Sequence, residues 1–151
     1  MRAKVIAIAM GLLASTTLAF AGGHASKEDA IAMVKKAVAT IKSEGTGKAY
    51  PEIDKVGGPF SQGDLYVAVL DFKGVTLAHG ANHKLIGKSL IAVPDVDGKL
   101  FVKAMVDSAQ KEPTFWVDYK FVNPTTKKIE PKSMYCERLD ETIVCAGIYK
   151  S

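Results

Sequence analysis

Several aromatic and basic side chains in the C-terminal two thirds of this 151-residue chain could line a binding pocket. Tyrosine and tryptophan combine an apolar ring with a hydrogen-bond donor, and lysine adds a positive charge. Pockets for small molecules have mostly apolar walls with a few such polar groups. The alternative is that these side chains fill the core and keep their polar ends at the margin of a sheet. The residues are Tyr66, Trp116, Tyr119, Lys132 and Tyr135.

The sequence lacks the residue patterns of common enzymes. His79 and His83 have the i, i+4 spacing of two metal ligands on a helix, but Gly80 between them indicates a strand end and a loop, so we expect no metal site. A neutral His79 that forms hydrogen bonds is the expectation. No glycine-rich phosphate loop and no Gly-x-Ser-x-Gly elbow is present. We therefore expect a protein that is not an enzyme and has no cofactor.

The segment Asp95-Val96-Asp97-Gly98 is similar to the start of a calcium-binding loop. Lys99 occupies the next ligand position and no glutamate completes the set, which argues against calcium. We expect instead that an aspartate side chain caps a helix beginning near Lys99.

The first 21 residues have the features of a secretory signal peptide. Two basic residues precede an apolar run of 14 residues, and Ala19-Phe20-Ala21 supplies the small-residue cleavage pattern. The run is shorter than the roughly 20 residues that cross a bilayer. We expect cleavage after Ala21, a mature domain over 22–151 that does not insert into a membrane, and a periplasmic or secreted location.

The charge gives no indication of a nucleic-acid partner. The whole chain has 20 basic and 16 acidic side chains, a net charge of +4, and removal of residues 1–21 leaves 18 against 16, a charge of +2. The remaining positive charges are scattered rather than clustered. We expect no binding to nucleic acid.

The two cysteines are placed to form a cross-strand disulfide. If Asp140 and Glu141 make a two-residue turn, the flanking strands pair so that Cys136 lies directly opposite Cys145. In an exported protein this arrangement predicts a disulfide. We expect a structural role, because thiol–disulfide enzymes usually carry Cys-x-x-Cys near a helix N-terminus.

The N-terminal part of the mature chain predicts two helices. The first begins after a near capping box at Ser26, continues through an apolar stripe at three- and four-residue spacing, and ends near Gly45. A shorter helix follows, in which Pro51 is tolerated only in the first turn. The stripe is Ile31, Val34, Val38 and Ile41, and the second helix runs through Tyr50, Ile53 and Val56.

The rest of the chain predicts an α+β fold with an antiparallel sheet of five strands. A helix between the second and third strands must end before Pro113. The loop at 80–97 is long for a compact domain, which suggests that it forms the wall or lid of a pocket. The expected strands are 65–72, 75–79, 114–122, 128–138 and 142–149.

Eight short segments resemble a known family through their order and spacing. They are 63–71, 74–79, Asn82 with 85–88, 94–99, 116–119, 123–124, 131–135 and 147–150. Together they resemble a single Cache domain of the second type over residues 26–150. This resemblance implies a PAS-like five-stranded antiparallel sheet with a long N-terminal helix and a layer of helix and loop.

The resemblance also implies a function as an extracytoplasmic sensor module. Such domains belong mostly to chemoreceptors and histidine kinases, and bind small carboxylates such as acetate, propionate, pyruvate or lactate between sheet and loop. Because no transmembrane helix or signalling domain follows, we expect a binding module without its own effector domain that passes its ligand state to a membrane-bound receptor or kinase. The alternative is a structural or interaction protein of the cell envelope with no small-molecule ligand.

A carboxylate needs a positive charge and hydrogen-bond donors in its pocket. We expect Lys132 to pair with the charge, His79 and Tyr135 to donate hydrogen bonds, and Trp116 and Tyr119 to act as walls or donors. Because side chains alternate along a strand, Trp116 and Tyr119 point to opposite faces of the sheet, and so do Lys132 and Tyr135. All five therefore face one pocket only if a bulge or a strand end redirects some of them.

Overall fold

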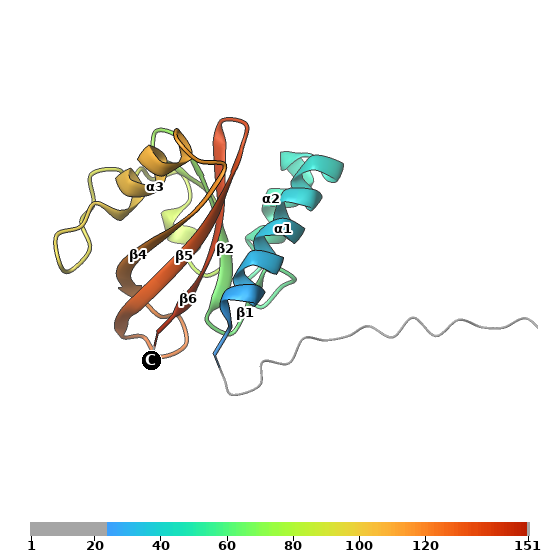
Figure 1. Cartoon of the computed structure of the whole chain (residues 1–151). Helices are drawn as coiled ribbons and strands as arrows, with labels where there is room; N and C mark the ends of the chain where they lie inside the picture. Colours follow the sequence, from blue (N-terminus) through green and yellow to red (C-terminus); the bar gives the residue numbers. More distant parts are fainter. Residues whose placement is uncertain (1–23, 151) are drawn as a thin grey trace, which may run out of the picture.

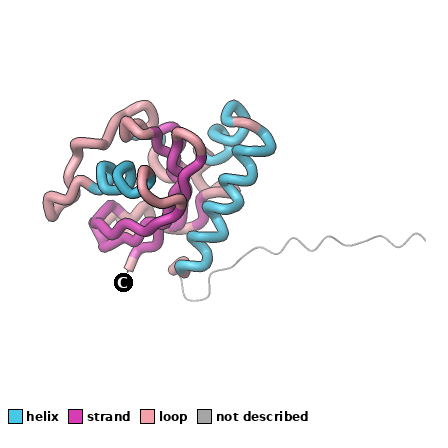
Figure 2. The backbone as a smooth tube through the Cα atoms, turned by 45° about the horizontal axis from the view of Figure 1, so that its top comes forward, coloured by secondary structure: helices cyan, strands magenta, loops and turns pink. Residues whose placement is uncertain are grey.

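The computed structural model describes residues 24–150, which form three layers (Figure 1). An antiparallel sheet lies between helices α1 and α2 on one face and helix α3 with a long loop on the other (Figures 1 and 2). This arrangement confirms the predicted α+β fold. The expected signal peptide, residues 1–21, lies outside the described residues.

Helix α1, Lys27–Glu44, begins where the sequence predicts. The Asp29 amide donates a hydrogen bond to the Ser26 hydroxyl at 3.1 Å, and the Ser26 amide donates to the Asp29 carboxylate at 2.8 Å. This reciprocal capping box satisfies amides that have no partner inside the helix. One side of α1 is buried against the sheet through Ala30, Met33, Val34, Ala37 and Ile41.

Helix α2, Thr46–Ile53, starts earlier than predicted and contains Pro51 in its interior. Only Gly45 separates it from α1. The φ angle of Gly45 is 79°, a conformation that glycine adopts readily and that ends one helix and turns the chain into the next. The prediction that Pro51 lies in the first turn was therefore wrong. Val56 lies beyond the helix and is exposed.

The sheet contains the five predicted strands and one additional short strand, β1. Its order is β1-β2-β6-β5-β4, and β3 also pairs with β2, so β6 and β5 lie in the interior of the sheet. All pairs are antiparallel. The bounds are β1 Ser61–Gln62, β2 Leu65–Asp71, β3 Thr76–His79, β4 Thr114–Val122, β5 Ile129–Leu139 and β6 Thr142–Tyr149.

The hairpin between β5 and β6 confirms the predicted disulfide. Leu139 pairs with Thr142 across the turn, and Cys136 pairs with Cys145 with their Cα atoms 4.1 Å apart. Both cysteines are fully buried in the apolar cluster between the sheet and α3. Their position in the core agrees with a structural role.

The loop between β3 and α3 contains a short 3-10 helix, η1, His83–Leu85. Helix α3, Phe101–Ala109, follows it and has no side-chain cap, so the predicted aspartate cap was wrong. Asp95 instead accepts hydrogen bonds from the amides of Asp97 and Lys99 within its own turn, and from the Lys120 amide on the outer strand β4. Because this carboxylate joins the loop to an edge strand, it holds the loop beside the sheet.

Candidate functional site

The candidate site lies on the face of the sheet that α3 and the long loop cover. Tyr119 on β4 pairs with Lys132 on β5, which in turn pairs with Tyr149 on β6. Residues paired directly across antiparallel strands point to the same face. The register therefore places two tyrosines on either side of one lysine.

Lys132 is a buried cation, with only 1% of the residue exposed. Its ammonium group donates hydrogen bonds to the hydroxyl of Tyr66 at 2.8 Å and to the hydroxyl of Tyr149 at 3.4 Å. It also lies 4.0 Å from the centre of the Tyr66 ring and 4.7 Å from that of Tyr149, within cation–π distance. Among residues 24–150, no carboxylate forms an ion pair with it.

The donor and the acceptor can be assigned in each hydrogen bond between the hydroxyl groups around Lys132. Tyr149 donates its proton to the carbonyl of Val122 at 2.7 Å. The contact of 3.3 Å between the hydroxyls of Tyr66 and Tyr149 must then use the proton of Tyr66. Lys132 has three protons, of which these two hydroxyls accept two, so one N–H remains for another acceptor.

Tyr119 and Tyr149, which pair with Lys132 from the two neighbouring strands, stay protonated. Burial raises the pKa of the Tyr149 hydroxyl far above its usual value, and the neighbouring Tyr66 adds to this effect. Burial also raises the pKa of Tyr119 strongly, again with a contribution from Tyr66. Neither phenol can therefore serve as the counter-charge of the ammonium group at physiological pH.

His79, at the end of β3, presents a hydrogen-bond donor to the same region. Its Nδ1 accepts hydrogen bonds from the amides of Ala81 at 3.2 Å and Asn82 at 2.9 Å, so the ring proton resides on Nε2. Burial lowers the pKa of His79 to about 3, with smaller contributions from the charges of Lys132 and His83. The imidazole is therefore neutral, as predicted, and its Nε2–H can donate.

Two cavities lie next to Tyr66, the residue whose hydroxyl accepts a hydrogen bond from Lys132. The inner cavity has a volume of about 30 Å³ and has mostly apolar walls, formed by side chains of α3, of strands β2 to β5 and of the loop. The outer cavity has a volume of about 320 Å³ and lies between the 80–85 segment and the β4–β5 turn. Both share the side chains of Tyr66, His79, Leu85 and Phe121.

Thr76 adds a further polar group to the inner cavity. The residue is 1% exposed and lines the cavity, and its hydroxyl has no hydrogen-bond partner in the described part of the chain. A buried hydroxyl without a partner costs free energy, roughly 1–3 kcal/mol. It can therefore contribute to binding of a molecule that supplies an acceptor.

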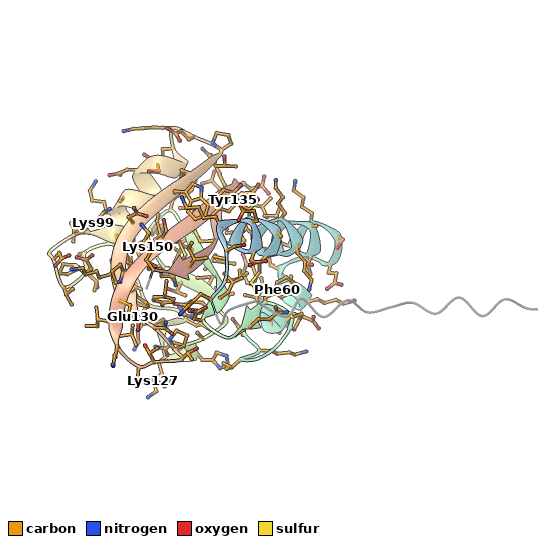
Figure 3. All side chains as sticks on the ribbon, turned by 60° about the horizontal axis from the view of Figure 1, so that its bottom comes forward. Phe60, Lys99, Lys127, Glu130, Tyr135 and Lys150 are labelled. Atoms are coloured by element: carbon orange, nitrogen blue, oxygen red, sulfur yellow. A yellow bond between two sulfur atoms is a disulfide. The ribbon has the colours of Figure 1, made fainter. Side chains whose placement is uncertain are left out.

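The structure brings together three of the five predicted site residues. His79, Tyr119 and Lys132 lie on the face toward α3, whereas Trp116 and Tyr135 lie on the opposite face. The rings of Trp116 and Tyr135 are 5.2 Å apart and pack against the α1 side of the core, and Figure 3 shows Tyr135 beside α1. Strand alternation is maintained at these positions, so no bulge redirects them toward the cavities.

Three polar groups at the site were not among the predicted ligand-binding residues: Tyr66, Thr76 and Tyr149. Tyr66 was recognised only as one of several amphipathic side chains. Tyr149 carries a signal in the sequence, because the register that pairs Cys136 with Cys145 also pairs Lys132 with Tyr149. Thr76 carries no comparable signal, since its role depends on where the loop covers β3.

The described residues contain neither a side-chain metal cluster nor a membrane-spanning helix. No group of three or more histidine, cysteine, aspartate or glutamate side chains is placed to hold a metal ion among them. Within the same residues, no helix is both long and apolar enough to cross a bilayer.

Solved structures of a chemotaxis protein and of two sensor domains are similar to this chain. A methyl-accepting chemotaxis protein from Vibrio parahaemolyticus is 25% identical, with a TM-score of 0.69 over 82% of this chain and 87% of that chain. A periplasmic sensor domain of a chemotaxis protein is 22% identical, with a TM-score of 0.65 over 82% and 90% of the two chains. A Cache chemosensory domain studied for carboxylic acid recognition is 20% identical, with a TM-score of 0.69 over 82% and 92%.

A family comparison agrees with these structural similarities. No curated protein matches the chain. The sequence model of the family described as Single Cache domain 2, however, matches residues 2–150, nearly the whole sequence. The chain therefore belongs to the single Cache domain 2 family, whose members are ligand-binding sensor domains and not enzymes.

Proposed function

We propose that this domain binds a small carboxylate in the inner cavity and the adjoining part of the outer one. The observation that carries the proposal is the buried ammonium group of Lys132, which has no carboxylate partner among the described residues. Removing a charge from water is costly unless an opposite charge or several hydrogen bonds compensate. The aromatic rings and two hydroxyls compensate in part, and a bound anion would complete the environment.

The polar groups around the cavity match an anion better than a cation or a neutral molecule. His79 and Thr76 line the inner cavity, and Lys132 contacts Tyr66, which also lines it. Each of the three has a donor that no described residue uses. A carboxylate offers several acceptor lone pairs and no donor. Hydrogen bonds between such an acceptor and a charged donor are also the stronger kind.

The volumes of the two cavities favour a small acid as the ligand. A cavity of about 30 Å³ has room for about two groups of the size of water, and the outer cavity can take the rest of the ligand. The related Cache chemosensory domain, which recognises carboxylic acids, supports the same class of ligand. Acetate, propionate, pyruvate and lactate are the first ligands to test.

We further propose that the domain works outside the cytoplasm and passes its ligand state to a membrane-bound receptor or kinase. A predicted signal peptide over residues 1–21 and a buried disulfide are consistent with export. One structural relative is a periplasmic sensor domain.

A thermal-shift screen of the mature protein tests the binding proposal. A ligand at about 100 times its Kd adds about 2.7 kcal/mol to the free energy of unfolding, which raises the Tm by several degrees. Acetate should raise the Tm, whereas acetamide, a neutral molecule of nearly the same shape, should not. If no acid raises the Tm at millimolar concentration, the alternative of an interaction protein without a small-molecule ligand is favoured.

A further inference from the structure

Thr76 and His79 lie three residues apart on β3, and both line the inner cavity. Side chains three positions apart on a regular strand point to opposite faces. Here a β-bulge in the pairing of β3 with β2 changes the alternation. Neighbouring residues of β2 pair with Ala78 and with Thr76, which leaves Leu77 as one extra residue in β3. The bulge therefore aims two hydrogen-bond donors into the same cavity.

We propose that this pair of donors makes the site prefer acids that carry a hydroxyl or keto oxygen on carbon 2 over plain acids of the same length. Thr76 is then the residue that determines the preference. The proposal rests on the carboxylate site proposed above and adds which acids that site selects. Lactate and pyruvate are acids of the preferred kind, whereas acetate and propionate are plain acids.

The loop that follows β3 encloses the hydroxyl of Thr76. The Thr76 amide donates a hydrogen bond to the carbonyl of Lys88 at 3.0 Å, and the Gly87 amide donates to the Thr76 carbonyl at 2.8 Å. These bonds hold the loop against β3, and Thr76 is 1% exposed. Its hydroxyl has no hydrogen-bond partner among residues 24–150. A group that enters the inner cavity can therefore become that partner.

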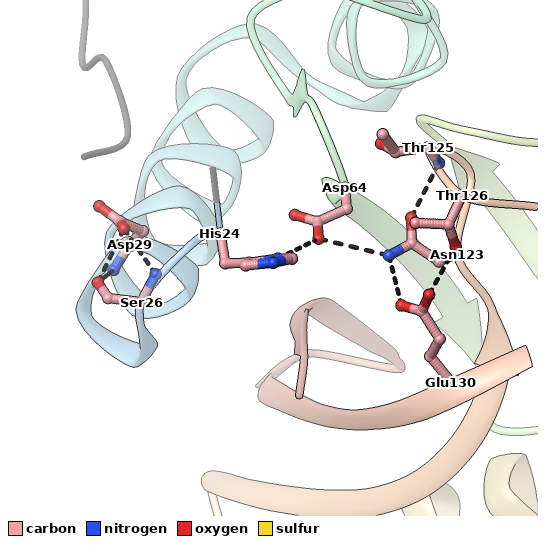
Figure 4. Close-up of polar contacts among 8 residues, drawn as sticks. All are labelled: His24, Ser26, Asp29, Asp64, Asn123, Thr125, Thr126 and Glu130. Carbon is pink, nitrogen blue, oxygen red and sulfur yellow. Dashed lines mark hydrogen bonds and ion pairs between the residues drawn. The ribbon is translucent and has the colours of Figure 1, made fainter. Parts of the chain in front are cut away.

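Two other threonine hydroxyls of the domain have a partner within the chain. Thr126, in the turn between β4 and β5, donates to the carboxylate of Glu130 at 2.6 Å (Figure 4). Thr142 donates to the carbonyl of Leu139 at 2.7 Å. Buried polar groups are normally hydrogen-bonded, so the exception at Thr76 needs an explanation. An acceptor supplied by the ligand provides one.

The spacing of the two donors requires more than one carboxylate group. Thr76 and His79 pair with Leu70 and Ala68, which are two residues apart on β2, so their Cα atoms lie about 7 Å apart. Side chains on one face of a strand stand roughly perpendicular to the sheet. Donors at this spacing are farther apart than the two oxygens of one carboxylate. A ligand that reaches both donors therefore carries a further acceptor.

The volume of the inner cavity limits where this further acceptor can lie. About 30 Å³ has room for about two groups of the size of water. One carboxylate oxygen beside His79 and one oxygen beside Thr76 fill that space. The second oxygen must therefore be on carbon 2, next to the carboxylate, and the rest of the molecule extends into the outer cavity.

The charges around the inner cavity indicate that the further acceptor is neutral. None of the described residues that line this cavity carries a positive charge, because His79 is neutral. The single ammonium group of Lys132, which contacts Tyr66, can balance one carboxylate. A second carboxylate would be buried without a counter-charge, which is costly. A hydroxyl or keto oxygen avoids this cost, and the hydroxyl of Thr76 can donate to either.

The first test compares lactate with propionate on the mature protein. Propionate has the same carbon skeleton and lacks only the oxygen on carbon 2. Isothermal titration should give a Kd for lactate about 2- to 10-fold below that for propionate, as expected for one neutral hydrogen bond. Pyruvate should show the same preference. Equal affinities, or tighter binding of propionate, overturn the preference and leave the carboxylate site intact, whereas binding of no acid at all counts against the site itself.

Thr76→Val tests the residue, because valine has a similar shape and no hydroxyl. The variant should bind lactate and propionate with equal Kd values. Its Tm without ligand should be no lower than that of the wild type, because a buried hydroxyl without a partner is removed.

Thr46→Val is the matched control, since Thr46 is exposed at the start of α2, and it should keep the preference for lactate. An undiminished preference in Thr76→Val would show that Thr76 does not contact the second oxygen, and it would overturn the assignment. The comparison of acids on the wild type does not depend on how the variants fold.

Discussion

The ammonium nitrogen of Lys132 lies 2.8 Å from the hydroxyl oxygen of Tyr66, although their strands are not neighbours in the sheet. Lys132 is on β5 and Tyr66 is on β2, and β6 runs between them. The side chain must therefore cross β6, and it does so at Gly147. A Cβ atom on Gly147 would lie 2.7 Å from Cε of Lys132, closer than real Cβ contacts allow.

Replacing Lys132 with methionine should abolish most carboxylate affinity without unfolding the domain. Loss of a charged hydrogen bond costs about 1.5–3 kcal/mol, so the Kd for acetate should rise by about 10- to 150-fold. Because methionine fills a similar volume without a buried charge, the Tm of the free protein should stay equal or rise. Isothermal titration and thermal unfolding measure the two effects.

Lys120→Met is the matched control for this variant. Its side chain forms an exposed ion pair with Asp97 at 3.0 Å, and such pairs contribute about 0–1 kcal/mol. This variant should bind acetate like the wild type. Equal affinities of Lys132→Met and the wild type would contradict the proposed site.

Gly147→Ala should weaken carboxylate binding by displacing Lys132. The φ angle of Gly147 lies outside the positive region, so an added methyl group is limited by space and not by backbone conformation. The new Cβ would also meet Sδ of Met134 at 2.8 Å. We expect overpacking to cost about 1–3 kcal/mol of stability in addition to the loss of affinity.

A double-mutant cycle separates the effect on Lys132 from general damage. In a Lys132→Met background, Gly147→Ala should cause no further loss of acetate affinity, because the charge that it displaces is already absent. Gly47→Ala, where an added Cβ meets nothing within 4 Å, controls for the substitution itself and should leave binding unchanged. Additive losses of affinity would show that Gly147 does not act through Lys132.

The sequence predicted those parts of the site that depend on the register of a hairpin. A turn at Asp140 and Glu141 was enough to pair Cys136 with Cys145, and the same counting reaches Lys132 and Tyr149 four pairs further on. Alternation along β4 and β5 also showed that Trp116 and Tyr135 point away from Tyr119 and Lys132. These inferences need only the period of a strand.

The remaining features depend on contacts between distant segments. Tyr66 reaches Lys132 because β2 lies beside β6, and no local pattern specifies which strands are neighbours. The choice of face depends on where α1 and α3 pack. The start of α2 was missed because tertiary packing of Ala49 and Ile53 outweighs the cost of Pro51 inside the helix.

Removal of the disulfide should lower stability. The bond closes a short loop between Cys136 and Cys145, for which chain entropy predicts a loss of about 2–3 kcal/mol in a double alanine variant. Denaturant unfolding measures this change. A reducing agent should lower the midpoint of the wild type toward that of the variant and leave the variant unchanged, and an insensitive wild type would contradict the prediction.

Burial of neutral His79 should make the domain lose stability as the pH falls. Its pKa is about 3 in the folded chain, below the value of 6.5 for an exposed histidine, mainly because of burial and also because of Lys132 and His83. Between these values the unfolded chain binds more protons than the folded one. The free energy of unfolding therefore rises with pH across this window, by at most about 1.4 kcal/mol per pH unit from this residue.

His79→Gln provides the comparison that isolates this contribution. The glutamine side chain can still accept the amide protons of Ala81 and Asn82 but does not titrate. Asp118 and Glu130, whose pKa values are lowered mainly by hydrogen bonds from Ser133 and Thr126, also destabilise the fold in acid, but they do so equally in both proteins. Urea unfolding from pH 3 to 7 should give a shallower pH dependence for the variant, and parallel curves would mean that His79 is not kept neutral by the fold.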